Sequence, residues 1–232
     1  MELNSYIDHT NLKNTSTLKD IETLCNEAIK YHFHSVCVYP YYVPLASELL
    51  KGSSVEVCTV IGFPMGMNTK ETKVYEAIDA IEKGATEIDM VINIAALKNQ
   101  DYEYVKEEIE EIRDAIDGKI LKVIIETCLL TDKEIVKMTE ICNETFVNFI
   151  KTSTGFSDSG AKVEDIELIN DYKNDVLEIK ASGGIRDLKT AEDMINAGAT
   201  RIGTSSGVAI MHEGCHCGDK ECHCGHNCKE DE

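Results

Sequence analysis

Three ionisable residues interrupt segments of the sequence that are otherwise apolar. Asp89 lies in EIDMVIN, Lys151 in FIKTSTG and Lys180 in EIKASGG. A buried charge costs several kcal/mol unless it is paired or changes its ionisation, so each of these residues needs a partner or a function. A structural ion pair, or a side chain that points into a helix layer, would account for any one of them. Three together on neighbouring strands favour a functional site.

Lys151 and Lys180 indicate covalent chemistry on a carbonyl compound. Two ammonium groups on adjacent strands repel each other, and partial burial also disfavours charge, so we expect one of the two amines to be neutral near neutral pH. A neutral lysine amine attacks a carbonyl carbon and forms a Schiff base. Asp89, two strands away, would compensate the remaining positive charge and handle protons.

Two glycine-rich segments near the end of the sequence indicate an anion site. Residues 182–186 read SGGIR, and residues 203–207 read GTSSG and are expected to open a short helix. Small residues let backbone N–H groups approach a phosphate closely, and barrel enzymes commonly bind phosphate in the loops after strands seven and eight. Arg186 would add a positive charge there, although a surface ion pair is the more common fate of an arginine.

Elements that could position these residues recur along the whole chain. Segments rich in β-branched residues are predicted as strands at 6–10, 35–40, 55–64, 87–93, 121–127, 149–155, 178–184 and 201–207. Between them, apolar residues recur at helical spacing. Two such helical faces are Val74, Ala77, Ile78 and Ile81, and Val105, Ile109, Ile112 and Ile116. Gly84, Gly118 and Gly198 stand where helices are expected to end.

Strands that alternate with helices indicate parallel βα units, and eight such units favour a closed barrel. The predicted fold class is therefore α/β, a single (β/α)8 TIM barrel with a short irregular C-terminal tail. An open doubly wound sheet is the structural rival, but no G-x-G-x-x-G follows the first predicted strand. We expect the barrel to comprise residues 1–211 and the tail residues 212–232.

The same segments carry a resemblance to a known family. EIDMVIN, LKVIIET, FIKTSTGFSDSGA, IKASGGIR and GATRIGTSSGVAI resemble the signature segments of the 2-deoxyribose-5-phosphate aldolases, and the resemblance runs from about residue 3 to residue 211. It implies a class I, Schiff-base aldolase of deoxyribose phosphate catabolism. Such an enzyme reversibly cleaves 2-deoxy-D-ribose 5-phosphate to D-glyceraldehyde 3-phosphate and acetaldehyde, with no cofactor in catalysis.

The resemblance also implies roles for individual residues. Lys151 would form the imine, Lys180 would tune its reactivity, and Asp89 would act in proton transfer. The residues implied in binding the phosphate and the substrate are Gly155, Gly183, Gly184, Arg186, Gly203, Ser205 and Ser206, together with Asp8, Thr10 and Cys37 near the substrate. Cys37 as a small core residue and Asp8 as a turn cap are the simpler alternatives for those two.

Composition narrows the choice of partners. The 232 residues include 23 basic and 42 acidic side chains, and a net charge of −19 would repel nucleic acid and anionic membranes. The expected partner is a small phosphorylated sugar, and a homo-oligomer is left open. No apolar run approaches the roughly 18 residues of a membrane span, and MELNSYIDHT lacks the basic and apolar pattern of a signal peptide. We therefore expect a cytoplasmic protein.

The tail has a chemistry of its own. The motif C-H-C-G occurs at 215–218 and again at 222–225. The candidate metal ligands are Cys215, Cys217, Cys222, Cys224, Cys228, His216, His223 and His226. Thiolate and imidazole groups suit Zn(II), Cu(I) or Ni(II), although the C-x-C spacing differs from that of ordinary structural zinc sites. A free, redox-sensitive tail is the alternative to a metal site.

Two other functions compete with the aldolase. Metal binding through the tail could be the principal task of the chain, with the barrel as its carrier. The chain could also be another phosphate-binding barrel enzyme, such as an isomerase. That second reading leaves Lys151 and Lys180 without a purpose.

Overall fold

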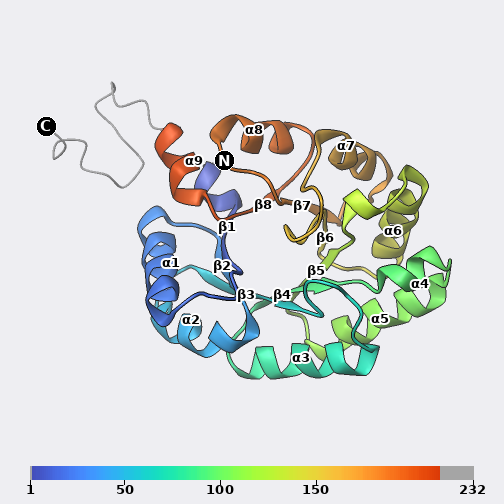
Figure 1. The fold of residues 1–232 in the computed structure, drawn as a ribbon, viewed down its shortest axis with the longest axis horizontal. Coiled ribbons are helices and arrows are strands. Elements are labelled where there is room, and N and C mark those ends of the chain that lie inside the picture. Colours follow the sequence, from blue (N-terminus) through green and yellow to red (C-terminus); the bar gives the residue numbers. More distant parts are fainter. Residues whose placement is uncertain (1, 215–232) are drawn as a thin grey trace, which may run out of the picture.

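Eight strands alternate with helices along the chain and close into a parallel barrel inside a ring of helices (Figure 1). The computed structural model describes residues 2–214. β1 pairs with β2 on one side and with β8 on the other, which closes the barrel. The predicted (β/α)8 barrel is thus confirmed, and the open doubly wound sheet is ruled out.

The strands are Ile7–Asn11 (β1), Ser35–Val38 (β2), Glu56–Ile61 (β3), Glu87–Val91 (β4), Ile120–Ile124 (β5), Phe149–Lys151 (β6), Glu178–Ser182 (β7) and Arg201–Thr204 (β8). The α-helices are Leu18–Tyr31 (α1), Val43–Leu49 (α2), Lys70–Glu82 (α3), Ile94–Lys98 (α4), Tyr102–Ala115 (α5), Asp132–Glu144 (α6), Val163–Tyr172 (α7), Leu188–Asn196 (α8) and Gly207–Glu213 (α9). Short 3₁₀ turns lie at Leu3–Tyr6, Pro40–Tyr42 and Thr127–Leu129. α9 continues two residues past the expected barrel boundary at residue 211.

Several strands end earlier than predicted. β3 was expected to reach residue 64 and β6 residue 155, but they stop at Ile61 and Lys151. Gly62, the residue directly after β3, has a φ angle of 58°, which is incompatible with a strand, and Gly155, four residues after the end of β6, has a φ angle of 83°. The apolar and small residues beyond these points form loops over the carboxyl ends of the strands.

The predicted helical faces are confirmed in part. Val105, Ile109, Ile112 and Ile116 are all buried. The prediction was wrong for Ile78 of α3, which is 38% exposed. The buried residues of α3 are Lys73, Ala77 and Ala80. The helix is therefore rotated so that a lysine faces inward.

Lys73 and Glu108 form a buried ion pair that hydrogen-bonds to the backbone at the end of β4. The Lys73 ammonium lies 2.6 Å from a Glu108 oxygen and donates to the carbonyl of Val91 at 2.8 Å. The other Glu108 oxygen accepts from the N–H of Asn93 at 3.0 Å. This buried pair ties α3 and α5 to the strand that carries Asp89.

No helix among the described residues is long and apolar enough to cross a membrane. The longest, α1 and α5, have 14 residues each, against about 20 for a spanning helix.

The floor of the barrel, where the strands begin, is ionic. Arg201 opens β8 and contacts Asp8 at 2.9 Å and Glu87, which opens β4, at 3.2 Å. Lys122 of β5 lies 2.6 Å from Glu87, and His34 contacts the same carboxylate at 3.0 Å from the outside. Asp8, Glu87, Lys122 and Arg201 are all buried. The barrel interior is therefore held together by charge as well as by apolar packing.

Glu87 shows how strongly this network acts. Burial alone would raise the pKa of its carboxyl, but Lys122, the hydrogen bond with His34 and Arg201 outweigh burial and lower the pKa to about 2. A carboxylate whose pKa is depressed on folding adds stability above its unfolded pKa and loses that stability as the pH falls toward its folded pKa.

We predict that Glu87→Gln makes the free energy of unfolding depend less on pH in the acid range. In the wild-type protein the free energy of unfolding should fall between pH 4.5 and about pH 2, with Glu87 contributing up to roughly 1.4 kcal/mol per pH unit. The variant should lack this contribution and also be less stable at neutral pH, because Lys122 loses a partner. Urea unfolding across this pH range measures both effects. Glu167→Gln, on an exposed face of α7, is the control; equal acid slopes in all three proteins would contradict the prediction.

Candidate active site

A cavity of about 460 Å³ opens over the carboxyl ends of the strands. Its walls come from the end of β1 and the segment after it, from α1, and from the ends of β6, β7 and β8 with the loops that follow them. Lys151, the last residue of β6, is part of its lining. Loops at this end of a parallel barrel are where such folds place their chemistry.

Lys151, Lys180 and Asp89 meet in the interior of the barrel. Strand register places Lys151 directly opposite Lys180. The side-chain nitrogens of both lysines contact the same oxygen of Asp89, at 2.8 Å for Lys151 and 2.7 Å for Lys180. Lys180 and Asp89 are fully buried, whereas Lys151 is 3% exposed. The three charges singled out in the sequence thus form one cluster, with Lys151 on its cavity side.

The ionisation of the two buried members follows from their contacts. Burial would raise the pKa of Asp89, but Lys122, Lys151 and Lys180 hold it well below its usual range. Burial would lower the pKa of Lys180, but Asp8 and Asp89 outweigh burial and raise it. Asp89 is therefore a carboxylate and Lys180 an ammonium ion throughout the physiological pH range.

Charge balance distinguishes Lys151 from the other cations of the cluster. Asp8, Glu87 and Asp89 supply three negative charges, and Lys122, Lys180 and Arg201 supply three positive ones. Among the described residues of this cluster, a proton on Lys151 would be a charge in excess. An uncompensated charge in a buried position is unfavourable.

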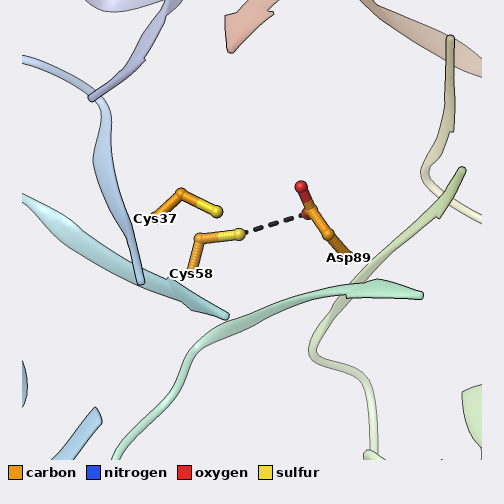
Figure 2. Close-up of side chains that lie close together, drawn as sticks. All are labelled: Cys37, Cys58 and Asp89. Atoms are coloured by element: carbon orange, nitrogen blue, oxygen red, sulfur yellow. Dashed lines mark hydrogen bonds between the residues drawn. The ribbon is translucent and has the colours of Figure 1, made fainter. Parts of the chain in front are cut away.

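Two cysteines complete the interior beside Asp89. Cys37 and Cys58 lie opposite each other on β2 and β3, and their sulfur atoms point toward Asp89 (Figure 2). The Cys58 thiol donates to Asp89 Oδ1 at 3.1 Å. The hydrogen bond with Cys58 is the main cause that lowers the pKa of Cys37, while burial raises the pKa of Cys58 well above its ordinary value.

Cys37, Cys58 and Asp89 also have the composition of a metal site, with ligand atoms within 4.8 Å of one another. Lys122 already fills the cation position, because its nitrogen lies 3.2 Å from the Cys58 sulfur and 2.7 Å from Asp89 Oδ1. A metal ion here would also face Lys151 and Lys180. The cluster therefore does not fit a resident metal. The candidate ligands of the tail, from Cys215 to Cys228, lie outside the described residues.

The expected phosphate-binding residues lie on one side of the cavity. Those that line it are Gly155, Gly183, Gly184, Arg186, Gly203 and Ser205. A Cβ added to Gly184 would meet no atom within 4 Å, so its backbone is open to a ligand. A Cβ on Gly203 would lie 3.0 Å from Lys180 Cε. Glycine at that position therefore leaves room for the lysine.

Of the four other residues expected to bind the substrate, only one lines the cavity. Thr10 lines the cavity and donates its hydroxyl to the carbonyl of Asp8 at 2.9 Å. Asp8 and Cys37 are fully buried below the cavity and do not line it. Ser206 is the N-cap of α9 and lies just beyond the lining.

Sequence reasoning missed much of the supporting network. Lys122, Glu87 and Arg201 each lie in a predicted strand, but none of them was given a role. Lys122 in LKVIIET carries the same signal as Lys151, a charge within an apolar run, and could have been found by it. Glu87 and Arg201 stand at strand starts, where a charge is ordinary, so the sequence gives no such signal for them.

Two further residues of the cavity region were also missed. His9 lines the cavity and contacts Glu27 of α1 at 2.7 Å. Glu126 follows β5 with a φ angle of 55°, and its carboxylate accepts from the N–H of Thr154 at 3.1 Å and from the Thr154 hydroxyl. Glu126 thereby braces the loop that follows Lys151.

Comparison with known proteins agrees with this arrangement. The family model of the DeoC/LacD family aldolases matches residues 3–213. The deoxyribose-phosphate aldolase of Clostridium tetani is 55% identical over 214 residues, which cover 92% of this chain and 99% of that protein.

Solved structures give the same result. The aldolase QR15 is 45% identical and has a TM-score of 0.88, over 92% of this chain and 96% of its own. The deoxyribose phosphate aldolase from Aeropyrum pernix, described as tetrameric, is 34% identical with a TM-score of 0.84, over 90% of this chain and 88% of its own. The resemblance noted in the sequence is confirmed, and the chain belongs to the DeoC/LacD family of aldolases.

Proposed function

We propose that this protein is a deoxyribose-phosphate aldolase. It would reversibly cleave 2-deoxy-D-ribose 5-phosphate to D-glyceraldehyde 3-phosphate and acetaldehyde through a Schiff base on Lys151. The observation that carries the proposal is the position of Lys151, which lines the cavity and contacts an oxygen of Asp89 that it shares with the Lys180 cation. The family and the names of its relatives support the substrate.

The covalent steps follow from the neutral amine. Lys151 Nζ attacks C1 of the open-chain aldehyde, and loss of water gives an iminium ion. Acetaldehyde carries C1 and C2, so the bond that breaks is C2–C3. The C3 hydroxyl loses its proton as C3 becomes the carbonyl carbon of D-glyceraldehyde 3-phosphate, and the bonding electrons move to the iminium nitrogen to give an enamine. Protonation at C2 and hydrolysis release acetaldehyde and restore the amine. The iminium is the electron sink, so the steps require no cofactor.

Asp89 and Lys180 would support these steps in different ways. A carboxyl with so low a pKa is a weak base. We therefore assign Asp89 mainly to orienting both lysines, with protons passing through the hydrogen bonds that it organises, including an ordered water. Lys180 would keep positive charge beside Lys151 and so favour the neutral amine. The glycine-rich loops and Arg186 would hold the phosphate and place C1 over Lys151.

We further propose a cytoplasmic homo-oligomer whose catalytic unit is the barrel. The five cysteines among the described residues are free thiols, which is typical of a reducing compartment. The tetramer described for the Aeropyrum pernix relative supports self-association.

A second candidate function rests on the tail. Its eight thiol and imidazole groups between residues 215 and 228 suit Zn(II), Cu(I) or Ni(II). We propose that the tail binds one of these metals and is accessory to catalysis, since the family match ends at residue 213.

Lys151→Ala should abolish imine formation. Borohydride reduction in the presence of 2-deoxyribose 5-phosphate or acetaldehyde should trap a covalent adduct on the wild-type protein, and peptide mapping should place it on Lys151. Lys133→Ala, an exposed lysine of α6, is the control and should be trapped like the wild type. An adduct that maps to any other lysine would refute the assignment.

Lys180→Ala should slow trapping by about 100-fold at neutral pH. Its removal leaves Lys151 as the nearest cation to that oxygen of Asp89, so Lys151 retains its proton and is not nucleophilic. Part of the lost rate should return at higher pH, where the proton is removed. Trapping rates measured from neutral to alkaline pH test this. A loss of the same size at every pH would show that Lys180 acts in some other way.

Truncation after Gly214 should remove metal binding and leave aldolase activity within about twofold of the full chain, an expectation that follows from independent sites. Calorimetric titration of both proteins with Zn(II), Cu(I) and Ni(II), beside an aldolase assay, measures the two properties. Loss of activity on truncation would show that the tail is not accessory. Unchanged metal binding would place the metal site in the barrel.

A further inference from the structure

The loops after β6 and β7 touch through two glycines. A Cβ built on Gly160 would lie 2.0 Å from the carbonyl oxygen of Gly183 and 2.2 Å from its carbonyl carbon. A Cβ on Gly183 would in turn lie 2.9 Å from Gly160 Cα. The two backbones are therefore in direct contact, and neither position has room for a side chain.

Gly160 is required for space alone. Its φ angle lies outside the left-handed region, whereas Gly183 has a φ of 83° and is a glycine for conformational reasons as well. An alanine at position 160 would thus suit its own backbone but displace the backbone of residue 183. No flexible side chain is available to absorb the contact.

Hydrogen bonds join the same two loops. The N–H of Ala161 donates to the carbonyl of Ser182 at 3.0 Å and to that of Gly183 at 3.1 Å. The Ser182 hydroxyl donates to the carbonyl of Ser153 at 2.6 Å. A displacement of the loop after β6 is therefore passed to the loop after β7.

The amine end of the site is held separately. The carbonyl of Lys151 accepts from the N–H of Ile125 at 3.0 Å, and the N–H of Thr152 donates to the carbonyl of Lys180 at 3.1 Å. The Lys151 side chain is held by Asp89. These contacts lie within the barrel wall and interior and do not include Gly160.

We propose that Gly160 is a positioning residue for the phosphate group of the substrate. Through its contact with Gly183 it sets the height of the loop at 183–186 above Lys151, and so the preference for phosphorylated over unphosphorylated substrates. The inference rests on the proposed function, because it assumes that this loop binds phosphate. Backbone N–H groups must lie at hydrogen-bond distance from the phosphate oxygens, and a misplacement of about 1 Å is enough to cost roughly 100-fold.

The test is the variant Gly160→Ala, in which phosphate binding and the chemistry at Lys151 are measured separately. The KM for 2-deoxyribose 5-phosphate and the dissociation constant of inorganic phosphate should each rise by at least about tenfold. Cleavage of unphosphorylated 2-deoxyribose and borohydride trapping with acetaldehyde should stay within about twofold of the wild type, because the amine end is held separately. The control is Gly214→Ala, at a position with a φ of −73° and no atom closer than 3.6 Å to an added Cβ.

A second variant tests the contact between the two loops through the N–H of Ala161. Ala161→Pro removes the N–H that donates to Ser182 and Gly183, and it should weaken phosphate binding in the same direction. Unchanged phosphate binding in both variants overturns the proposal. So does an equal loss with phosphorylated and unphosphorylated substrates, a failure of both variants to fold, or a wild-type protein that does not bind phosphate.

The proposed function fails by a different result. If the wild-type protein forms no acetaldehyde adduct on Lys151, the Schiff-base assignment is wrong. In that case the dissociation constants of inorganic phosphate for the wild type and the Gly160→Ala variant, measured by calorimetry, still decide the role of Gly160.

Discussion

One oxygen of Asp89 accepts from both Lys151 and Lys180 inside a barrel that excludes most water. A carboxylate in such a place is costly unless its surroundings are positive. Two lysine side chains in contact with one carboxylate oxygen are costly if both carry a charge that nothing compensates. The arrangement satisfies both conditions by pairing most of its charges below the cavity. The group left at the boundary between the ion cluster and the cavity is Lys151.

The rest of the interior is arranged around this requirement. β5 supplies Lys122 to the other oxygen of Asp89, and the barrel floor neutralises Lys122 with Glu87. Gly203 leaves space for Lys180, and the Cys58 thiol donates to Asp89 and accepts from Lys122. The ion network inside the barrel thus holds the Lys151 side chain in place, while the glycine-rich loops line the cavity at the carboxyl ends of the strands.

The sequence predicts the barrel and the central cluster well, because both depend on simple patterns. Strand and helix segments alternate, and a charge within an apolar strand is visible in the sequence as Asp89, Lys151 or Lys180. Residues whose position depends on three-dimensional packing were not predictable. Lys73, and not Ile78, points inward because its ammonium forms a buried ion pair with Glu108, 35 residues later in the chain. The need for Gly160 arises from a backbone that approaches it from another loop.

The contact between Arg201 and Asp8 joins residues 193 positions apart. Asp8 and Glu87 both contact Arg201, so the acidic groups of the floor lack one of their cations until β8 pairs with β1. Such a partial barrel has no stable dry interior. The first and last strands of the barrel thus depend on each other through one ion pair as well as through their backbone pairing.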